Sequence, residues 1–343
     1  MRTDSLRLVP VVRIMLNQNA MCNAVDELFS RTIPDRVWHY TSLSALEGIL
    51  TSNRVWATDC RFTNDTTEFV HMRDVADGCI QSLQSSGSMG SFPSLDLHGM
   101  LHLAFDRGPL SSAENEVCII SFSEACDALT QWNQYADGAR GVSIAFDLQN
   151  VRPPAEARIG VTFAPCVYDQ NGKEQLVKSV FERFTDAVAM LDEQSKNPAW
   201  LEGQLRTWRL IDDIFGRGFD RSAFTAANTQ KFTDKLRSAW RLTVFDLLRV
   251  ASHCKHDAFF AEREWRLAMP RPKSRPSTEH PVQYRGMNND IPYFESDLFC
   301  VNKLPIVEIK AGPLCTELER IQAAIEQNGY ECPVTRSGIP LRH

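Results

Sequence analysis

A block of roughly 80 residues, from Lys173 to His253, has apolar residues at helical spacing and is broken at Asn197-Pro198. Short runs of strand type, rich in β-branched and aromatic residues, lie on both sides of this block. They are Val37–Tyr40, Val55–Thr58, Val117–Phe122, Gly141–Asp147 and Val161–Tyr168 before it, and Trp265–Met269 and Ile306–Lys310 after it. Shorter helices are predicted at Ala45–Leu50, Thr66–Leu83, Leu129–Tyr135 and from a Thr316 cap to Gln327.

Strands interrupted by a long helical block predict an α+β fold with a large helical insertion. We expect a lead-in at 1–34, an α+β core of catalytic type at 35–170 and 257–343, and the insertion at 171–256. The insertion mixes tryptophan with many arginines and lysines. Such helices either bury tryptophan in a core beneath an arginine-rich surface or bind an acidic partner or nucleic acid, and the sequence leaves both readings open.

Composition limits the environment and the partners. The formal net charge is −6 and the pI is near 5.8, which argues against wholesale electrostatic binding of nucleic acid. No stretch of about 18 uninterrupted apolar residues suggests a membrane span. The ten cysteines form no C-x-x-C pair, which favours buried thiols in a reducing cytoplasm over a disulfide framework or a zinc site. We therefore expect a cytoplasmic protein with no membrane partner and no bound metal.

The segment His39-Tyr40-Thr41 places polar groups at the end of a strand, just before a helix. A histidine there can donate to a ribose hydroxyl or to a backbone carbonyl, and Thr41 can add a second donor. A core histidine satisfied by the backbone gives the same pattern.

A second segment runs from Phe62 to Glu68 and contains Asn64 and Asp65. Its polar residues are candidates for a ligand site. They also suit a helix start, with Asn64 or Asp65 as the cap and Glu68 in the first turn.

A third segment begins with Ser121-Phe122-Ser123. Two serines two apart on a strand share a face, where they can orient a carboxylate or a ligand. Trp132 and Tyr135 follow, three apart on a helix, and serve either as core anchors or as rings that stack on a ligand.

The fourth segment is Glu262-Arg263-Glu264-Trp265-Arg266. Two glutamates two apart at a strand start point the same way, and if both are buried the pKa of one should rise. Such a pair is a usual device for acid–base chemistry. An exposed edge strand with alternating charges has the same letters.

Taken together, these segments resemble a bacterial family of unknown function, domain-of-unknown-function family 2971. The resemblance spans about Trp38 to Leu267. It rests on H-Y-T, on N-D-x-x-E, on S-F-S with W-x-x-Y-A-x-G-x-x-G-V, and on E-x-E-W-R. That family is similar in turn to the ADP-ribosyltransferases, whose common plan is a split antiparallel sheet that grips NAD+ between two halves.

The resemblance implies an NAD+-dependent ADP-ribosyltransferase, or an NAD+ glycohydrolase, acting on an unknown macromolecular acceptor, protein or nucleic acid. A role as a toxin or phage-defence effector follows from such an activity. It implies catalytic roles for Glu264, which would stabilise positive charge on the ribose, and for Glu262, which would deprotonate the acceptor. Ser121 would orient Glu264.

The same resemblance implies how NAD+ would be held. His39 and Thr41, with Tyr40 between them, would hold the adenosine side, and Tyr135 or Trp132 would stack on nicotinamide. The pyrophosphate would meet Arg140 or Arg61, because a guanidinium matches phosphate oxygens at two points. The remaining candidates for the NAD+ site are Asn64, Asp65 and Ser123.

Two other classes of function remain open. A degenerate member would keep the fold as a ligand- or partner-binding module. A metal-dependent nuclease would use carboxylates with Mg²⁺, drawn from Asp59, Asp65, Glu68, Glu262 and Glu264.

Overall fold

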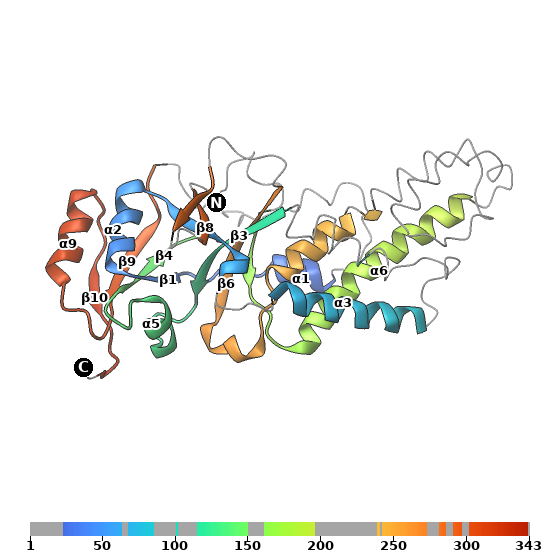
Figure 1. Cartoon of the computed structure of the whole chain (residues 1–343), viewed down its shortest axis with the longest axis horizontal. Coiled ribbons are helices and arrows are strands. Elements are labelled where there is room, and N and C mark those ends of the chain that lie inside the picture. The colour runs from blue at the N-terminus through green and yellow to red at the C-terminus, as the bar shows by residue number, and fades with distance from the viewer. Residues whose placement is uncertain are drawn as a thin grey trace, which may run out of the picture.

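The computed structural model describes residues 23–63, 68–85, 101, 115–149, 161–195, 239–240, 242–272, 281–285, 291–296 and 302–341. In Figure 1 a sheet flanked by α2, α5 and α9 lies beside a group of packed helices. The fold is of the mixed α+β type.

Ten described strands form one open sheet in which almost every pairing is antiparallel. Its main path runs β10 (Val334–Arg336), β9 (Ile306–Ala311), β4 (Val142–Phe146), β1 (Val37–Thr41), β3 (Asn115–Ser123), β2 (Val55–Asp59), β8 (Ile291–Ser296) and β7 (Gln283–Arg285). Strand β6 (Glu264–Pro272) pairs with β3, and β5 (Thr162–Pro165) pairs with β6. The β9–β10 pair is parallel.

Strand β3 is the point at which the sheet divides. One edge of β3 pairs with β6 along its whole length, from Asn115 to Ser123. The other edge is shared, because β1 pairs with it at Ser123 and β2 pairs with it at Ile119 and Cys118. Strands β1 and β2 therefore diverge beside Ser121, and we call the gap between them the β1–β2 fork.

Successive side chains of a strand point to opposite faces of the sheet, so each face packs against a different set of helices. Val37, Ile120 and Leu267 face a core that α2 (Leu43–Ser52) and α9 (Leu318–Gln327) complete. On the opposite face, Trp38 and Tyr40 pack with α5 (Leu129–Tyr135).

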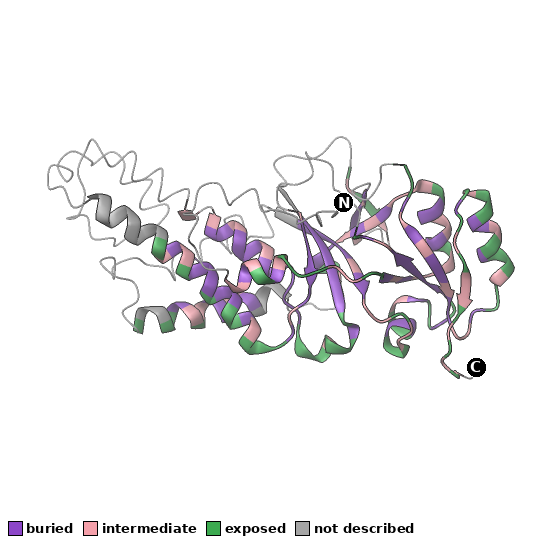
Figure 2. Cartoon of the chain, turned by 180° about the vertical axis from the view of Figure 1, so that it is seen from behind, coloured by how far each residue is buried: buried purple, intermediate pink, exposed green. Residues whose placement is uncertain are grey.

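The group of packed helices covers another part of that opposite face. It comprises α1 (Ala24–Phe29), α3 (Glu68–Ser85), α6 (Gln170–Ser195) and the helical residues 242–251. Their apolar side chains share one core with Ile119 of β3 and Ala268 of β6. Figure 2 shows buried residues continuing from the sheet into these helices. The boundaries of the predicted lead-in and insertion stay predictions.

Most predicted elements are confirmed, and the differences lie at their ends. The Leu129–Tyr135 helix has the predicted bounds. Ser42 caps α2 by accepting a hydrogen bond from the amide of Ala45 at 3.2 Å. The cap predicted at Thr316 is wrong, because α9 begins at Leu318 with Glu317 before it. The predicted Asn64 or Asp65 cap, and residues 196–238 of the helical block, lie outside the described residues.

No helix in the described ranges is long and apolar enough to cross a membrane. The eight cysteines that lie in those ranges carry reduced thiols.

Candidate functional site

The third and fourth polar segments meet on adjacent strands. Ser123 pairs with Glu264 and Ser121 pairs with Arg266 across β3 and β6. Directly opposite residues in an antiparallel pair share a face, so these four side chains form one polar group. It lies on the face that α5 covers at one end and the packed helices at the other.

A sharp turn brings Glu262 to the same place as Glu264. Glu262 ends a 3-10 helix, η6 (Asp257–Glu262), and the next residue, Arg263, has a φ of 45°. This left-handed residue reverses the chain before β6 begins at Glu264. Arg263 is exposed and donates to Glu124 at 2.9 Å, whereas both glutamates are 4% exposed. Turn geometry, rather than the predicted strand alternation, juxtaposes the two carboxylates.

The two carboxylates share one lysine, Lys255, which is 2% exposed. Its Nζ donates to Glu262 Oε2, and to Glu264 Oε2 at 2.9 Å. Arg266, which is fully buried, donates to Glu264 through Nε at 2.7 Å and Nη2 at 3.1 Å. We call Lys255, Glu262, Glu264 and Arg266 the carboxylate cluster. Its two cations balance its two carboxylates, which is the condition for keeping buried charges.

For Glu264 this balance opposes the rise in pKa that burial alone would cause. Burial acts to raise the pKa of Glu264, but Arg266, Lys255 and a hydrogen bond from Ser121 outweigh it and lower that pKa to about 2. Burial likewise acts to lower the pKa of Lys255, and the two glutamates outweigh it, so its pKa is raised. Glu264 and Lys255 are therefore both charged at neutral pH.

The two serines differ in what they hold. Ser121 supports the ionised form of Glu264 through a side-chain hydrogen bond. Ser123 is 2% exposed and donates to the backbone carbonyl of Glu262 at 2.6 Å. It also accepts from the amide of Ala125 at 3.0 Å. Ser123 therefore fixes the turn before Glu264.

The two aromatic residues of α5 also have different roles. Tyr135 donates its hydroxyl to Glu262 Oε1 at 2.9 Å, and burial, with the charge of Glu262, raises the pKa of this phenol. Trp132 is 0% exposed, meets Tyr40 edge to face at 4.8 Å and donates to Asp127 at 2.6 Å. Trp132 thus takes the core role that the sequence left open. Tyr40 supports the same helix by accepting from the amide of Ala128 at 3.2 Å.

His39 lies in the β1–β2 fork. Its Nδ1 is 2.9 Å from the carbonyl oxygen of Ser121, and its ring is 6.0 Å from that of Phe122. Burial lowers the pKa of His39, and the charge of Arg285 lowers it further. A neutral imidazole that donates from Nδ1 to a carbonyl has a lone pair at Nε2. His39 is therefore built to accept from a hydroxyl, not to donate to one.

The other predicted NAD+ contacts do not join this group. Thr41 ends β1 and is half-buried, and Arg140 lies exposed in the turn between α5 and β4. Arg61 donates to Asp59 through Nε at 2.9 Å. Asn64 and Asp65 lie outside the described residues.

Sequence reasoning missed three members of the site. Lys255 and Tyr168 were not singled out, and Arg266 was quoted in a motif without a role. Tyr168 accepts from the amide of Glu264 at 2.8 Å, and its hydroxyl is held protonated because burial raises its pKa. The motif E-x-E-W-R could have pointed to Arg266 and to a second cation, because two buried glutamates require positive charges nearby.

The described residues offer no set of side chains that could bind a metal ion. Within the described ranges, no three histidine, cysteine or acidic side chains stand close enough to hold a metal ion. Asp59 is instead paired with Arg61. The nuclease hypothesis stays a prediction.

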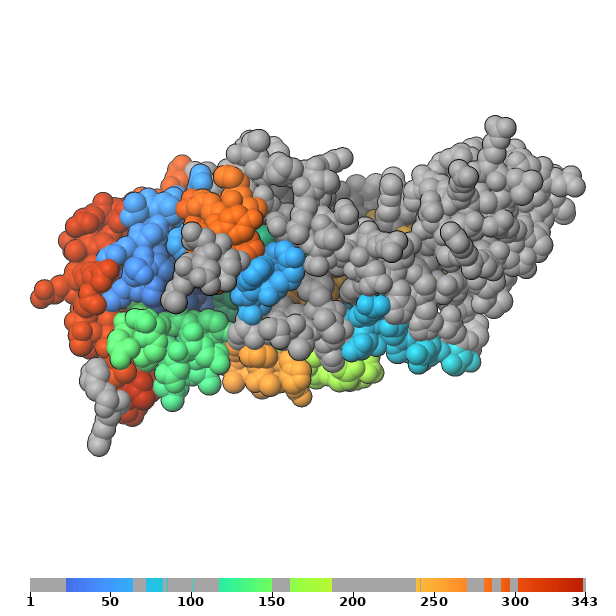
Figure 3. All heavy atoms as spheres, viewed as in Figure 1, coloured from blue at the N-terminus to red at the C-terminus, as the bar shows by residue number. Residues whose placement is uncertain are grey.

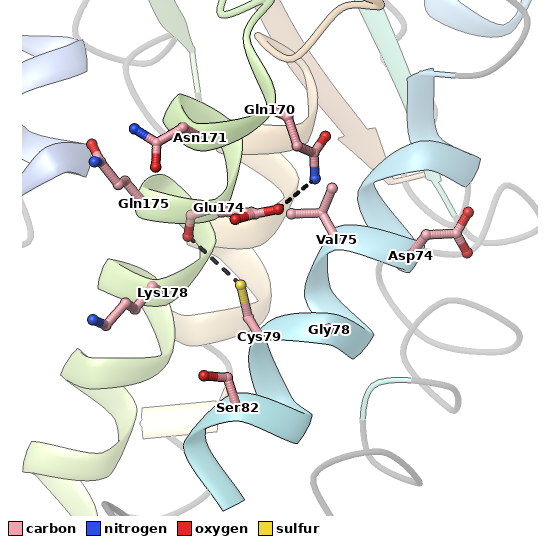
Figure 4. A pocket seen from close by; sticks show the side chains of 10 residues that line it. All are labelled: Asp74, Val75, Gly78, Cys79, Ser82, Gln170, Asn171, Glu174, Gln175 and Lys178. Atoms are coloured by element: carbon pink, nitrogen blue, oxygen red, sulfur yellow. Dashed lines mark hydrogen bonds between the residues drawn. The ribbon is translucent and has the colours of Figure 1, made fainter. Parts of the chain in front are cut away.

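A cavity of about 550 Å³ lies between α3 and α6, apart from the carboxylate cluster (Figure 4). Its wall includes Cys79, which donates to the carbonyl of Glu174 at 3.6 Å. Burial raises the pKa of this thiol to about 11, so it is protonated at neutral pH. The cavity thus lacks an activated nucleophile among the residues that the structure describes.

His253 carries a testable consequence for stability. It is fully buried between the carbonyls of Arg249, at 2.9 Å from Nδ1, and Arg266, at 3.2 Å from Nε2, and burial lowers its pKa from 6.5 to about 4. As the pH falls, His253 is therefore protonated in the unfolded chain before it is protonated in the folded one. The free energy of unfolding keeps the full contribution of neutral His253 above pH 6.5, and we expect it to fall by about 3 kcal/mol by about pH 4.

Urea titrations between pH 7 and 4 measure this loss. We expect the free energy of unfolding of His253→Gln to depend less steeply on pH than that of the wild type, because the variant lacks the imidazole that titrates in this range. Glu264→Gln serves as the control, because its carboxylate contributes mainly below pH 4.5. An unchanged slope in His253→Gln would show that His253 does not titrate in this way.

The structure defines the chain as an α+β protein whose mostly antiparallel sheet carries a buried, charge-balanced cluster beside a division of the sheet. Residues 131–267 match the model of the family described as "Protein of unknown function (DUF2971)". The matched range begins in α5 and ends just after Arg266, so it contains the whole carboxylate cluster. No curated protein and no solved structure matches the chain.

Proposed function

We propose that the protein cleaves NAD+ between nicotinamide and ribose and passes ADP-ribose to a macromolecular acceptor or to water. The observation that carries the proposal is Glu264, a carboxylate kept ionised at neutral pH on a sheet strand, with a second carboxylate on the same lysine. The contact of His39 with the ribose stays a prediction, because His39 shares the sheet face of Val37 and not that of Glu264.

The chemistry requires a negative charge at one place. When the bond between the ribose C1′ and nicotinamide breaks, nicotinamide leaves with the bonding electrons and positive charge grows on the ribose. A fixed carboxylate nearby lowers the energy of that state, and more so in a low-dielectric site than in water. Glu264 would act in this way, held in orientation by Arg266 and Ser121.

The second carboxylate would serve the other half of the reaction. An acceptor oxygen or nitrogen forms a bond to C1′ and loses its proton, which Glu262 would take. Tyr135 donates to Glu262 Oε1, so it sets the direction in which this carboxylate points. The resemblance gives NAD+ as the substrate. A toxin or phage-defence role stays a prediction.

One observation favours a second candidate, a binding module that does no chemistry. Both oxygens of Glu264 already accept hydrogen bonds, Oε1 from Arg266 and Oε2 from Lys255 and Arg266. A substrate hydroxyl would have to share or displace these partners. A cluster kept for the stability of the sheet would have the same geometry.

Biotinylated NAD+ distinguishes these candidates. The purified protein is incubated with the label and a cell lysate, and biotin is followed on macromolecules while free ADP-ribose is followed by chromatography. Label on an acceptor supports a transferase, and free ADP-ribose alone supports a glycohydrolase. If neither forms above the level given by heat-inactivated protein, the enzyme proposal fails and the binding module is favoured.

A further inference from the structure

A cation stands on the far side of the β1–β2 fork from His39. Arg285, the last residue of β7, is half-buried, and its guanidinium lies 5.2 Å from the centre of the Trp56 ring and 5.5 Å from that of Tyr293. Its Nη2 donates to Thr58 Oγ1 at 2.8 Å. Figure 3 shows β7 and β8, in orange, beside the blue residues of α2 and β2 on one face of the molecule.

Arg285 has no carboxylate partner within the described part of the chain. The acidic residue on the neighbouring strand β8, Glu295, is paired instead with Arg54, at 3.6 Å. The aromatic rings hold the guanidinium in place but do not neutralise it. Burial lowers the pKa of Arg285, whereas a nearby carboxylate would raise it. A half-buried cation of this kind leaves donors open to an external anion.

The neighbours of Arg285 suggest the kind of anion. Thr58 and Trp56 lie on the half-buried face of β2, and Val55 and Ala57 on its core face. The charge of Arg285 reaches His39, whose pKa it lowers. By strand register His39 shares the sheet face of Val37, whereas Thr58, which pairs with Ile119, lies on the face that carries Ser121 and Glu264. Arg285, the hydroxyl of Thr58 and two aromatic rings therefore form one patch on the same face as the carboxylate cluster. A phosphate group offers the oxygens that a guanidinium binds at two points.

We infer that Arg285 and Thr58 form an anion-binding subsite that takes a phosphate group. The guanidinium donates to two phosphate oxygens, and the Thr58 hydroxyl fixes its orientation. If the proposed function holds, the phosphate belongs to the pyrophosphate of NAD+. This inference rests on that function for the identity of the ligand, and on the contacts of Arg285 for the site. It replaces Arg61 and Arg140 in that role.

Calorimetric titration with inorganic pyrophosphate at low ionic strength tests the subsite without any catalysis. We expect Arg285→Gln to weaken binding about tenfold or more, because charge-assisted two-point hydrogen bonds are lost. Thr58→Val keeps the guanidinium and removes only its anchoring hydroxyl, and it should weaken binding less. Arg54→Gln is the matched control, since it removes one positive charge from the same part of the sheet; we expect binding within about twofold of wild type. Circular dichroism shows whether each variant is folded.

The outcomes separate this inference from the proposed function. No pyrophosphate binding by the wild type, or equal losses in Arg285→Gln and Arg54→Gln, overturns the subsite even if NAD+ is cleaved. If Arg285→Gln fails to fold, Thr58→Val decides, and unchanged binding there overturns the assignment. Selective loss of binding without NAD+ cleavage by the wild type supports the subsite and counts against the enzyme.

Discussion

Glu264→Gln is expected to reduce the rate of nicotinamide release about 10³-fold. The substitution keeps the size of the side chain, and the amide oxygen can still accept from Arg266 Nε. It removes the negative charge that the proposed reaction needs beside the ribose. Removal of one preorganised electrostatic contact of this kind costs about 10²- to 10³-fold in other enzymes.

A matched variant is needed because Glu264 is also part of a buried ion cluster. Glu308 is another buried glutamate of the sheet, with Arg36 at 2.7 Å and the Thr335 hydroxyl at 2.7 Å. Glu308→Gln should leave nicotinamide release within about threefold of wild type. Equal losses in the two variants would assign the effect of Glu264 to stability.

Lys255→Met is expected to lower the free energy of unfolding by about 3–5 kcal/mol, because it leaves two buried carboxylates with one cation between them. Met keeps most of the length of the side chain and removes its charge. Urea denaturation at pH 7 measures the change.

The control is Lys178→Met, because Lys178 pairs with Glu182 at 3.8 Å on the exposed surface of α6. We expect that substitution to cost about 1 kcal/mol or less. The double variant Lys255→Met with Glu262→Gln should regain part of the loss by removing one unpaired carboxylate. A loss in Lys255→Met no larger than that in Lys178→Met would contradict the charge balance described for the cluster.

Periodicity predicted most of the fold because alternating and helical patterns are local. The strands around His39, Ser121 and Ile306 follow from alternation or apolar runs, and Leu129–Tyr135 from helical spacing. Strands β7, β8 and β10 were not predicted, since they are short and their pairing depends on distant partners. The division of the sheet at β3 is a property of that pairing, which no single segment encodes.

The candidate site was predicted where residues lie close in sequence. Ser121, Glu262 and Glu264 could be named because each belongs to a short motif. Lys255 could not, because its role depends on a turn that buries it between two glutamates. Arg285 was missed for the same reason, since its aromatic neighbours come from two other strands.

The most direct test of the account is nicotinamide release from NAD+ by the purified wild-type protein, with a cell lysate added as a source of acceptor. Chromatography follows the product over time, with Glu264→Gln and Glu308→Gln in parallel. The account predicts release by the wild type and by Glu308→Gln, and about 10³-fold less by Glu264→Gln. Release by no protein, or undiminished release by folded Glu264→Gln, would contradict it.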